Sequence, residues 1–234
     1  MSGRSGSASA FMLALAGIVS TVVLAVQHVQ QTGHPQERVA TTDNLKSLVQ
    51  RGRYLVLSHD CGGCHGGGSN PAAAGWLAGA SKPEDEFLIG PCAVKPGATP
   101  CFHTRPRNLT PDNMTGMGRF SERQLFNALR YGLRPEDTPD VEITSSTPGV
   151  GNFPLHPHYL APPMPWPAWR HMQDQDLWAI AAYLKRGVRP VHNKVADSEG
   201  PSDFWASEYT VEKIGPYPAP PFPTVNERAT VAAH

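Results

Sequence analysis

The sequence predicts a mostly α-helical domain in which a few helices are separated by long irregular loops. Apolar residues recur at helical spacing in three segments, within residues 45–56, 125–129 and 177–184. The chain of 234 residues contains 24 prolines and 22 glycines, together about a fifth of the total, which predicts extensive loops. Its length suits one domain with appendages or two small domains.

The first helical segment follows Thr42 or Asp43, either of which can cap the start of a helix. Its apolar positions at helical spacing are Leu45, Leu48, Val49, Leu55 and Val56. Gly52 interrupts the segment at a cost of about 1 kcal/mol relative to alanine. We therefore expect either a second helix that crosses closely at Gly52 or a tolerated glycine on the surface.

The second helical segment has a defined start and end. Ser121 and Gln124 form a capping box, and Phe120 with Leu125 forms a hydrophobic staple. Gly132 provides a left-handed stop after the helix. The chain between residues 133 and 163 contains no convincing helix.

The third helical segment runs from about Asp174 to Arg186, and Gly187 ends it. Trp178 and Tyr183 are expected at the margins of its apolar stripe, which consists of Leu177, Ile180, Ala181 and Leu184. Acidic residues in its first turn and basic residues in its last turn suit the helix dipole.

The most specific motif in the chain is Cys61-Gly62-Gly63-Cys64-His65. Two cysteines at positions i and i+3, with a histidine directly after the second, are typical of c-type haem attachment. Each thiol can add to one vinyl group of the porphyrin, and the histidine can then bind the iron. The two glycines have no side chains to collide with the macrocycle, and they tolerate a tight turn. The motif occurs once, so we expect one covalently bound haem c.

Two other chemistries also use a Cys-x-x-Cys pair. A structural zinc site needs two more ligands, usually in a second close pair, which Cys92 and Cys101 do not form. A thiol–disulfide redox pair of the thioredoxin type needs a βαβ frame, and no strand-rich pattern surrounds the motif. Haem attachment is therefore the favoured interpretation.

A low-spin electron-transfer haem also needs a sixth iron ligand, for which Met164 is favoured. Its thioether is soft and uncharged, which favours ferrous iron and raises the reduction potential. Pro163 and Pro165 stiffen the backbone on both sides, so the sulfur can be presented at a small entropic cost. Met117, in a glycine-rich loop, is the main rival. Further candidate ligands are Met114, Met172, His103, His156, His158 and His171.

Residues 66–107 are expected to be irregular, because they contain turn residues but little periodicity. Cys92 and Cys101 lie in this segment with eight residues between them. An oxidising compartment would let them pair, and a disulfide there contributes roughly 2.5–3 kcal/mol on the chain-entropy model. The alternative is a pair of free thiols.

The N-terminal region divides into three parts. Residues 1–7 form a short stub that contains Arg4, residues 8–26 form an apolar run, and residues 27–41 form a polar linker. A helix as long as the apolar run spans roughly 28 Å, close to the hydrocarbon thickness of a bilayer. We expect an uncleaved membrane anchor with the stub in the cytoplasm by the positive-inside rule. A cleaved secretory signal is the alternative.

The C-terminal extension, residues 191–234, is rich in proline, especially in the segment GPYPAPPFPT. We expect extended chain that drapes over the domain or reaches toward a partner. Charged residues make up 17% of the whole chain and the formal net charge is zero. The sequence therefore contains no basic stripe that would indicate binding to nucleic acid.

The order of these motifs is an amphipathic helix, CGGCH, a long loop, a middle helix, PPMPW and a closing helix that ends in AAYLKRG. In this order residues 42–190 resemble the class I c-type cytochromes, whose fold places a few helices around one covalently bound haem. The resemblance implies that the first and last helices cross near Gly52 and an aromatic residue such as Tyr183.

The stretch NLTPDNMTGMG resembles the Asn-Ile-Thr-Pro-Asp stretch of a narrower group. That group contains monohaem or multihaem cytochrome subunits that take electrons from periplasmic alcohol, aldehyde or related dehydrogenases. The chain departs from it in having one CxxCH motif where the alcohol dehydrogenase cytochrome subunits typically have three. It also has a cysteine-bearing insert around residues 80–105 and a long C-terminal tail.

These observations together predict an electron carrier rather than an enzyme. Cys61 and Cys64 attach the haem, and His65 and Met164 are the axial ligands of its iron. The expected partners are redox proteins, such as a dehydrogenase, an oxidase or another cytochrome, at the periplasmic face of the bacterial inner membrane. A soluble periplasmic protein is the alternative if the N-terminal segment is cleaved. Two other classes stay open, a haem enzyme of the peroxidase type and a haem-based sensor or structural subunit.

Overall fold

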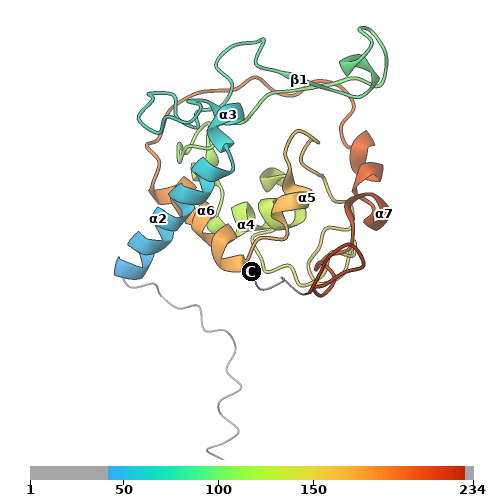
Figure 1. Cartoon of the computed structure of the whole chain (residues 1–234). Helices are drawn as coiled ribbons and strands as arrows, with labels where there is room; N and C mark the ends of the chain where they lie inside the picture. The colour runs from blue at the N-terminus through green and yellow to red at the C-terminus, as the bar shows by residue number, and fades with distance from the viewer. Residues whose placement is uncertain (1–41, 230–234) are drawn as a thin grey trace, which may run out of the picture. The chain divides into compact units, whose positions relative to one another are not determined.

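The computed structural model describes residues 42–229 (Figure 1). The predicted stub, membrane segment and linker, residues 1–41, lie outside this range. Within it, no helix is long and apolar enough to cross a membrane. The elements, with η denoting a 3-10 helix, are α2 (Thr42–Ser58), α3 (Cys61–His65), β1 (Phe87–Ile89), η1 (Pro91–Ala93), β2 (Phe102–Thr104), η2 (Met117–Arg119), α4 (Glu122–Tyr131), η3 (Pro135–Asp137), α5 (Trp166–Trp169), α6 (Asp174–Arg186), η4 (Phe204–Tyr209) and α7 (Val211–Ile214).

Helices α2 and α6 lie against each other in Figure 1, and Gly52 is at a close contact between them. A Cβ atom on Gly52 would overlap the carbonyl oxygen of Ala179 and approach Cβ of Tyr183 to 2.7 Å. The glycine therefore removes a side chain where the second helix lies, and the expectation of a close crossing is confirmed. The alternative of a tolerated surface glycine is wrong, because Gly52 is buried.

Helix α4 begins and ends where the sequence predicts. The hydroxyl of Ser121 accepts a hydrogen bond from the Gln124 amide, and the Gln124 side chain accepts one from the Ser121 amide, each at 3.0 Å. Gly132 ends the helix in the left-handed conformation, with φ of 69°. The capping box and the glycine stop are both confirmed. Both side chains of the expected staple, Phe120 and Leu125, are buried in the main core.

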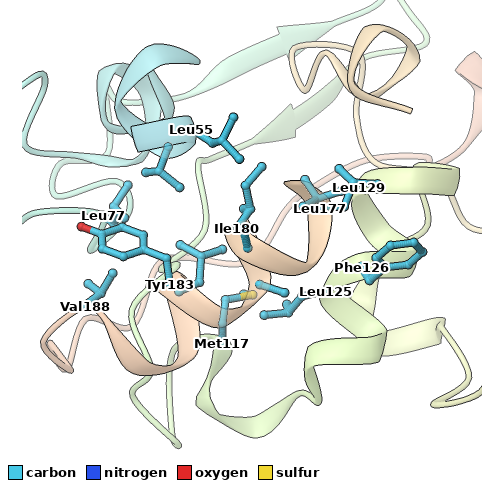
Figure 2. Packing of buried hydrophobic residues seen from close by; sticks show 14 of the residues in the cluster. Leu55, Leu77, Met117, Leu125, Phe126, Leu129, Leu177, Ile180, Tyr183 and Val188 are labelled. Atoms are coloured by element: carbon cyan, nitrogen blue, oxygen red, sulfur yellow. The ribbon is translucent and has the colours of Figure 1, made fainter. Parts of the chain in front are cut away.

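The main core lies between α2, α4 and α6. Figure 2 shows side chains from these helices and the intervening loops gathered around Ile180, including Leu55, Met117, Leu125, Leu129 and Leu177. Tyr183 belongs to this core at 3% exposure, so its expected place at the margin of the α6 stripe is wrong. An apolar stripe in the sequence indicates only one buried face of the helix, whereas α6 is also covered by α2 and by Trp76. The indole Nε1 of Trp76 donates a hydrogen bond to the Tyr183 hydroxyl at 3.2 Å.

Gly187 ends α6 as predicted, but in the right-handed conformation, with φ of −99° and ψ of −17°. A Cβ atom at this position would overlap the ring of Tyr183 and lie 2.9 Å from a methyl carbon of Val49. Packing against α2 and the Tyr183 ring therefore explains the glycine, rather than a left-handed turn.

Residues 66–107 are not wholly irregular, because they contain an antiparallel two-stranded sheet. β1 pairs with β2 in the register Phe87 with Thr104 and Ile89 with Phe102. Between the strands, Cys92 and Cys101 form a disulfide with a Cα–Cα distance of 5.5 Å. Each strand has three residues, which is too short for an alternating pattern to be recognised in the sequence.

The segment after α6 drapes over the domain, and in Figure 1 it runs past β1 before it reaches α7. Glu199 forms a backbone bridge with His103 of β2, and both hydrogen bonds are 2.8–2.9 Å long. Trp205 of η4 is 2% exposed and packs with Ile89 and Phe102 in a second core cluster. Part of the proline-rich extension thus contributes to the interior.

Candidate haem site

The two motif cysteines lie on a single helical turn, α3. Asp60 precedes this turn in the left-handed conformation, with φ of 51°, and its carbonyl accepts a hydrogen bond from the Gly63 amide at 3.0 Å. Cys61 is partly buried, Cys64 is exposed, and neither is disulfide-bonded. Positions i and i+3 of a helix project from the same side, so both thiols can reach one edge of a planar group.

The glycine at position 62 is required by the packing around the motif. Trp76 lies against it, and a Cβ atom on Gly62 would overlap the indole ring and the carbonyl oxygen of Gly68. The Gly68 amide donates to the Gly62 carbonyl at 3.0 Å, which folds the following loop back over α3. Trp76 thereby connects the motif to Tyr183 of α6 through its indole hydrogen bond.

His65 is oriented by a carbonyl group 42 residues away in the sequence. Its Nδ1 lies 2.7 Å from the carbonyl oxygen of Arg107. A carbonyl only accepts, so Nδ1 carries the hydrogen, and in a neutral imidazole Nε2 then keeps a free lone pair. Metal-binding histidines have this same arrangement, in which the second nitrogen donates to a carbonyl. The site therefore fits a haem iron bound through Nε2.

The electrostatic surroundings keep His65 neutral. Desolvation lowers the pKa of its imidazole below the usual value, and the hydrogen bond to the Arg107 carbonyl offsets only part of this effect. A neutral imidazole is the form that binds a metal. The protonation state and the orientation of His65 thus both favour a ligand role.

The surroundings of Cys61 do not favour thiolate chemistry. Burial raises the pKa of its thiol to about 12. Zinc binding and disulfide exchange both use the thiolate and are served by a lowered pKa. In residues 42–229, no three His, Cys, Asp or Glu side chains are grouped so that they could hold a metal ion. The raised pKa therefore disfavours the thiolate form of Cys61 in the folded chain.

The loop that carries Met164 packs near the motif. Met164 and Cys61 are both partly buried against the main core cluster. The rings of His59, two residues before Cys61, and Trp169 of α5 meet edge to face with centroids 5.9 Å apart. The fold thus brings Trp169, five residues after Met164, beside His59, two residues before the CGGCH turn.

The other candidate iron ligands range from buried to exposed. Met117 is 6% exposed and belongs to the main core cluster. Met114 is 76% exposed. Met172 shares the partial burial of Met164 against the core and stays a rival. The candidate histidines have other contacts: His103 lies near Glu86, His158 pairs with Asp203, His171 packs against Tyr217, and His156 is exposed.

Two contributors to this site have no signal in the sequence. The partner of His65 is the backbone carbonyl of Arg107, and every residue has such a carbonyl. Trp76 is an ordinary apolar residue until the fold places it on Gly62.

Comparison with known proteins gives the class that the chain resembles. No family model matches the chain. The similar curated proteins include cytochrome subunits of several dehydrogenases. The similarity is thus to a class of cytochrome subunits and not to the catalytic subunits of those dehydrogenases.

Three of these relatives show the extent of the similarity. The chain is 31% identical over 156 residues to the gluconate 2-dehydrogenase cytochrome c subunit of Pantoea cypripedii, covering 66% of this chain and 26% of that protein. It is 24% identical over 190 residues to the fructose dehydrogenase cytochrome subunit of Gluconobacter japonicus, covering 81% and 31%. It is 28% identical over 151 residues to the cytochrome c subunit of the quinone alcohol dehydrogenase of Gluconacetobacter polyoxogenes, covering 64% and 24%. The chain therefore spans about a quarter to a third of the length of these relatives.

Proposed function

We propose that this chain is a class I cytochrome c that transfers single electrons through one covalently bound haem c. Cys61 and Cys64 form the thioether bonds, and His65 and Met164 are the axial ligands. The observation that carries the proposal is the hydrogen bond from His65 Nδ1 to the Arg107 carbonyl, made on a turn that has two free cysteines on one side. When bound, haem c supplies one-electron exchange between ferric and ferrous iron.

The protein residues hold and tune this group. The Arg107 carbonyl fixes the ring plane and tautomer of His65, and hydrogen bonding of this kind raises the basicity of the ligand nitrogen. The thioether of Met164 adds no charge, which favours the ferrous state. The core cluster against which Cys61 and Met164 pack excludes water from one side of the site.

The partner that we propose is the catalytic subunit of a dehydrogenase. The names of the relatives support this choice, because each designates the cytochrome subunit of such an enzyme. We place the protein at the periplasmic face of the inner membrane, where haem c attachment occurs. The Cys92–Cys101 disulfide suits that oxidising compartment. Residues 8–26 then act as an anchor or as a cleaved signal.

Replacement of Met164 tests the ligand assignment. The full chain is produced with the c-type haem maturation machinery, and its haem content and oxidised spectrum are measured. Met164→Ala should keep the covalent haem but lose the sulfur-to-iron charge-transfer band at the red end of the spectrum. The reduction potential should also fall, because the sulfur that favours ferrous iron is gone.

Met172→Ala is the matched control, because Met172 is also partly buried against the same core. It should keep the band. Loss of the band in Met172→Ala with retention in Met164→Ala would transfer the ligand role to Met172. A wild-type chain that matures without covalent haem would overturn the proposed function as a whole.

A further inference from the structure

Met164 lies in a hydrogen-bonded turn that is fixed from both sides. Its amide donates to the carbonyl of Ala161, and its own carbonyl accepts from the amide of Trp166, each at 2.9 Å. Trp166 begins α5 and is 4% exposed, so its indole anchors the turn in the interior. The position of the Met164 sulfur therefore depends on what holds Trp166 and Ala161.

The indole of Trp166 is enclosed by residues from distant parts of the chain. Tyr159 stacks on it with ring centroids 5.9 Å apart and planes 5° apart. Tyr209 meets it edge to face at 4.9 Å and 68°. On another side, a Cβ atom on Gly132 would overlap the indole. Tyr209 belongs to η4, so a segment beyond residue 190 forms part of this enclosure.

Tyr209 also holds the backbone on the other arm of the turn. Its hydroxyl donates to the carbonyl oxygen of Leu160 at 3.1 Å, and Leu160 directly precedes Ala161. Ala161 packs against the cluster around Trp205. One side chain thus contacts both arms of the turn that carries Met164.

The segment is attached to the domain just before Tyr209. The Asp203 carboxylate accepts hydrogen bonds from the Arg134 guanidinium at 3.1 Å, from the Tyr159 amide at 3.2 Å and from His158 Nδ1 at 2.9 Å. Trp205 follows and is buried in the second core cluster. His158 and the Tyr159 amide lie in the loop that leads into the Met164 turn, so Asp203 attaches the segment to that loop.

A second attachment follows Tyr209. Nη2 of Arg170, the residue at the end of α5, donates to the carbonyl oxygens of Ile214 and Gly215 at 2.7 and 2.8 Å. Arg170 is 7% exposed, so these hydrogen bonds are shielded from water. The segment is therefore tied to both α5 and the preceding loop.

We propose that residues 203–215 form a clamp on the Met164 turn, and that Tyr209 is a positioning residue for the sixth iron ligand. This inference rests on the proposed function, since it requires Met164 to bind the iron. With the clamp in place, the turn cannot move outward without breaking the contacts of Tyr209 to Trp166 and Leu160. When those contacts are weakened, Met164 leaves the iron more often and small ligands such as imidazole can bind in its place.

The test uses the mature full-length protein and two readouts, the sulfur-to-iron band and the affinity of the oxidised haem for imidazole. Tyr209→Ala should weaken the band and raise the imidazole affinity at least about tenfold, which corresponds to roughly 1.4 kcal/mol. Tyr54→Ala is the matched control, because Tyr54 is 60% exposed on α2, and it should change neither readout. A folded Tyr209→Ala protein with the wild-type band and affinity would overturn the clamp.

A second variant decides the question if Tyr209→Ala does not fold. Tyr209→Phe keeps the ring against Trp166 and loses only the hydrogen bond to Leu160, so the imidazole affinity should rise about fivefold. An unchanged affinity in that variant would contradict the positioning role. A wild-type protein with covalent haem but no band would instead remove Met164 as ligand, and the clamp with it. A wild-type band with unaffected Tyr209 variants would overturn the clamp alone.

Discussion

The two predicted axial ligands are supported in different ways. His65 is the last residue of α3, which directly follows α2, and α2 packs tightly against α6 through Gly52. Met164 lies on an irregular turn that is held by a segment from the far end of the chain, through Tyr209. The first region relies on a helix–helix contact and the second on a few long-range contacts of loops. Regions of the second kind open locally at a lower free energy than a packed helix pair.

Because the first region relies on the helix crossing, damage at Gly52 should affect the whole domain. Gly52→Ala places a methyl group on the Ala179 carbonyl, so the helices must separate. Overpacking of this kind outweighs the better helix propensity of alanine, and we expect a loss of about 3 kcal/mol in the free energy of unfolding. Chemical denaturation followed by circular dichroism measures it.

Gly75→Ala is the control for this variant. No atom lies within 4 Å of a Cβ placed on Gly75, and its φ is not positive, so the change should be nearly neutral. Equal stabilities of the two variants would show that the crossing is not as tight as the contacts at Gly52 indicate.

Loss of the Cys92–Cys101 disulfide should give the next largest loss of stability, and this disulfide supports the second region. The strands on either side of it carry Ile89 and Phe102, on which Trp205 of the clamp packs. Replacing both Cys92 and Cys101 by serine should lower the free energy of unfolding by about 2.5–3 kcal/mol on the chain-entropy model. Covalent haem should stay, because Cys61 and Cys64 are not involved in the pair.

Reduction of the wild-type protein with a thiol reagent should reproduce the double variant. If denaturation curves of the oxidised and reduced wild type coincide, the disulfide does not stabilise the hairpin. Loss of haem in the double variant would mean that the two cysteine pairs depend on each other during maturation.

The first region was predictable because its signals are local. Gly52 in an amphipathic helix indicates a crossing partner, and the capping box of Ser121 and Gln124 marks the start of α4. The motif Cys-x-x-Cys-His indicates a site by itself. Each of these signals lies within a few residues of the feature that it predicts, so no knowledge of the tertiary fold is required.

The second region was not predictable because its contacts join distant segments. Nothing near Tyr209 indicates that its hydroxyl binds the Leu160 carbonyl. The three-residue strands depend on a disulfide and on a bridge to Glu199, and neither gives a periodic pattern. Long-range contacts also explain why the burial of Tyr183 was not predicted. It is buried by Trp76 and α2, which the apolar stripe of α6 does not reveal.

The smallest predicted effect concerns the loop that follows Arg107, on the His65 side of the site. The Asp112 carboxylate accepts hydrogen bonds from the Thr115 hydroxyl at 2.8 Å, the Thr115 amide at 2.7 Å and the Met114 amide at 3.1 Å. These hydrogen bonds, with the Thr115 hydroxyl first, lower the pKa of Asp112 below its usual value, and the nearby His192 acts in the same direction. The folded state therefore binds the carboxylate form more strongly than the unfolded state does.

A carboxyl whose pKa is lowered on folding stabilises the protein above its unfolded pKa, about 4, and loses this contribution as the pH falls through the folded value. Asp112→Asn should therefore lower stability at neutral pH and flatten the decline of stability below about pH 4. The amide oxygen of asparagine still accepts from Thr115, so the change should be the smallest of the three. Denaturation curves measured at neutral pH and in steps below pH 4 test it, and parallel pH profiles of wild type and variant would show that Asp112 does not contribute.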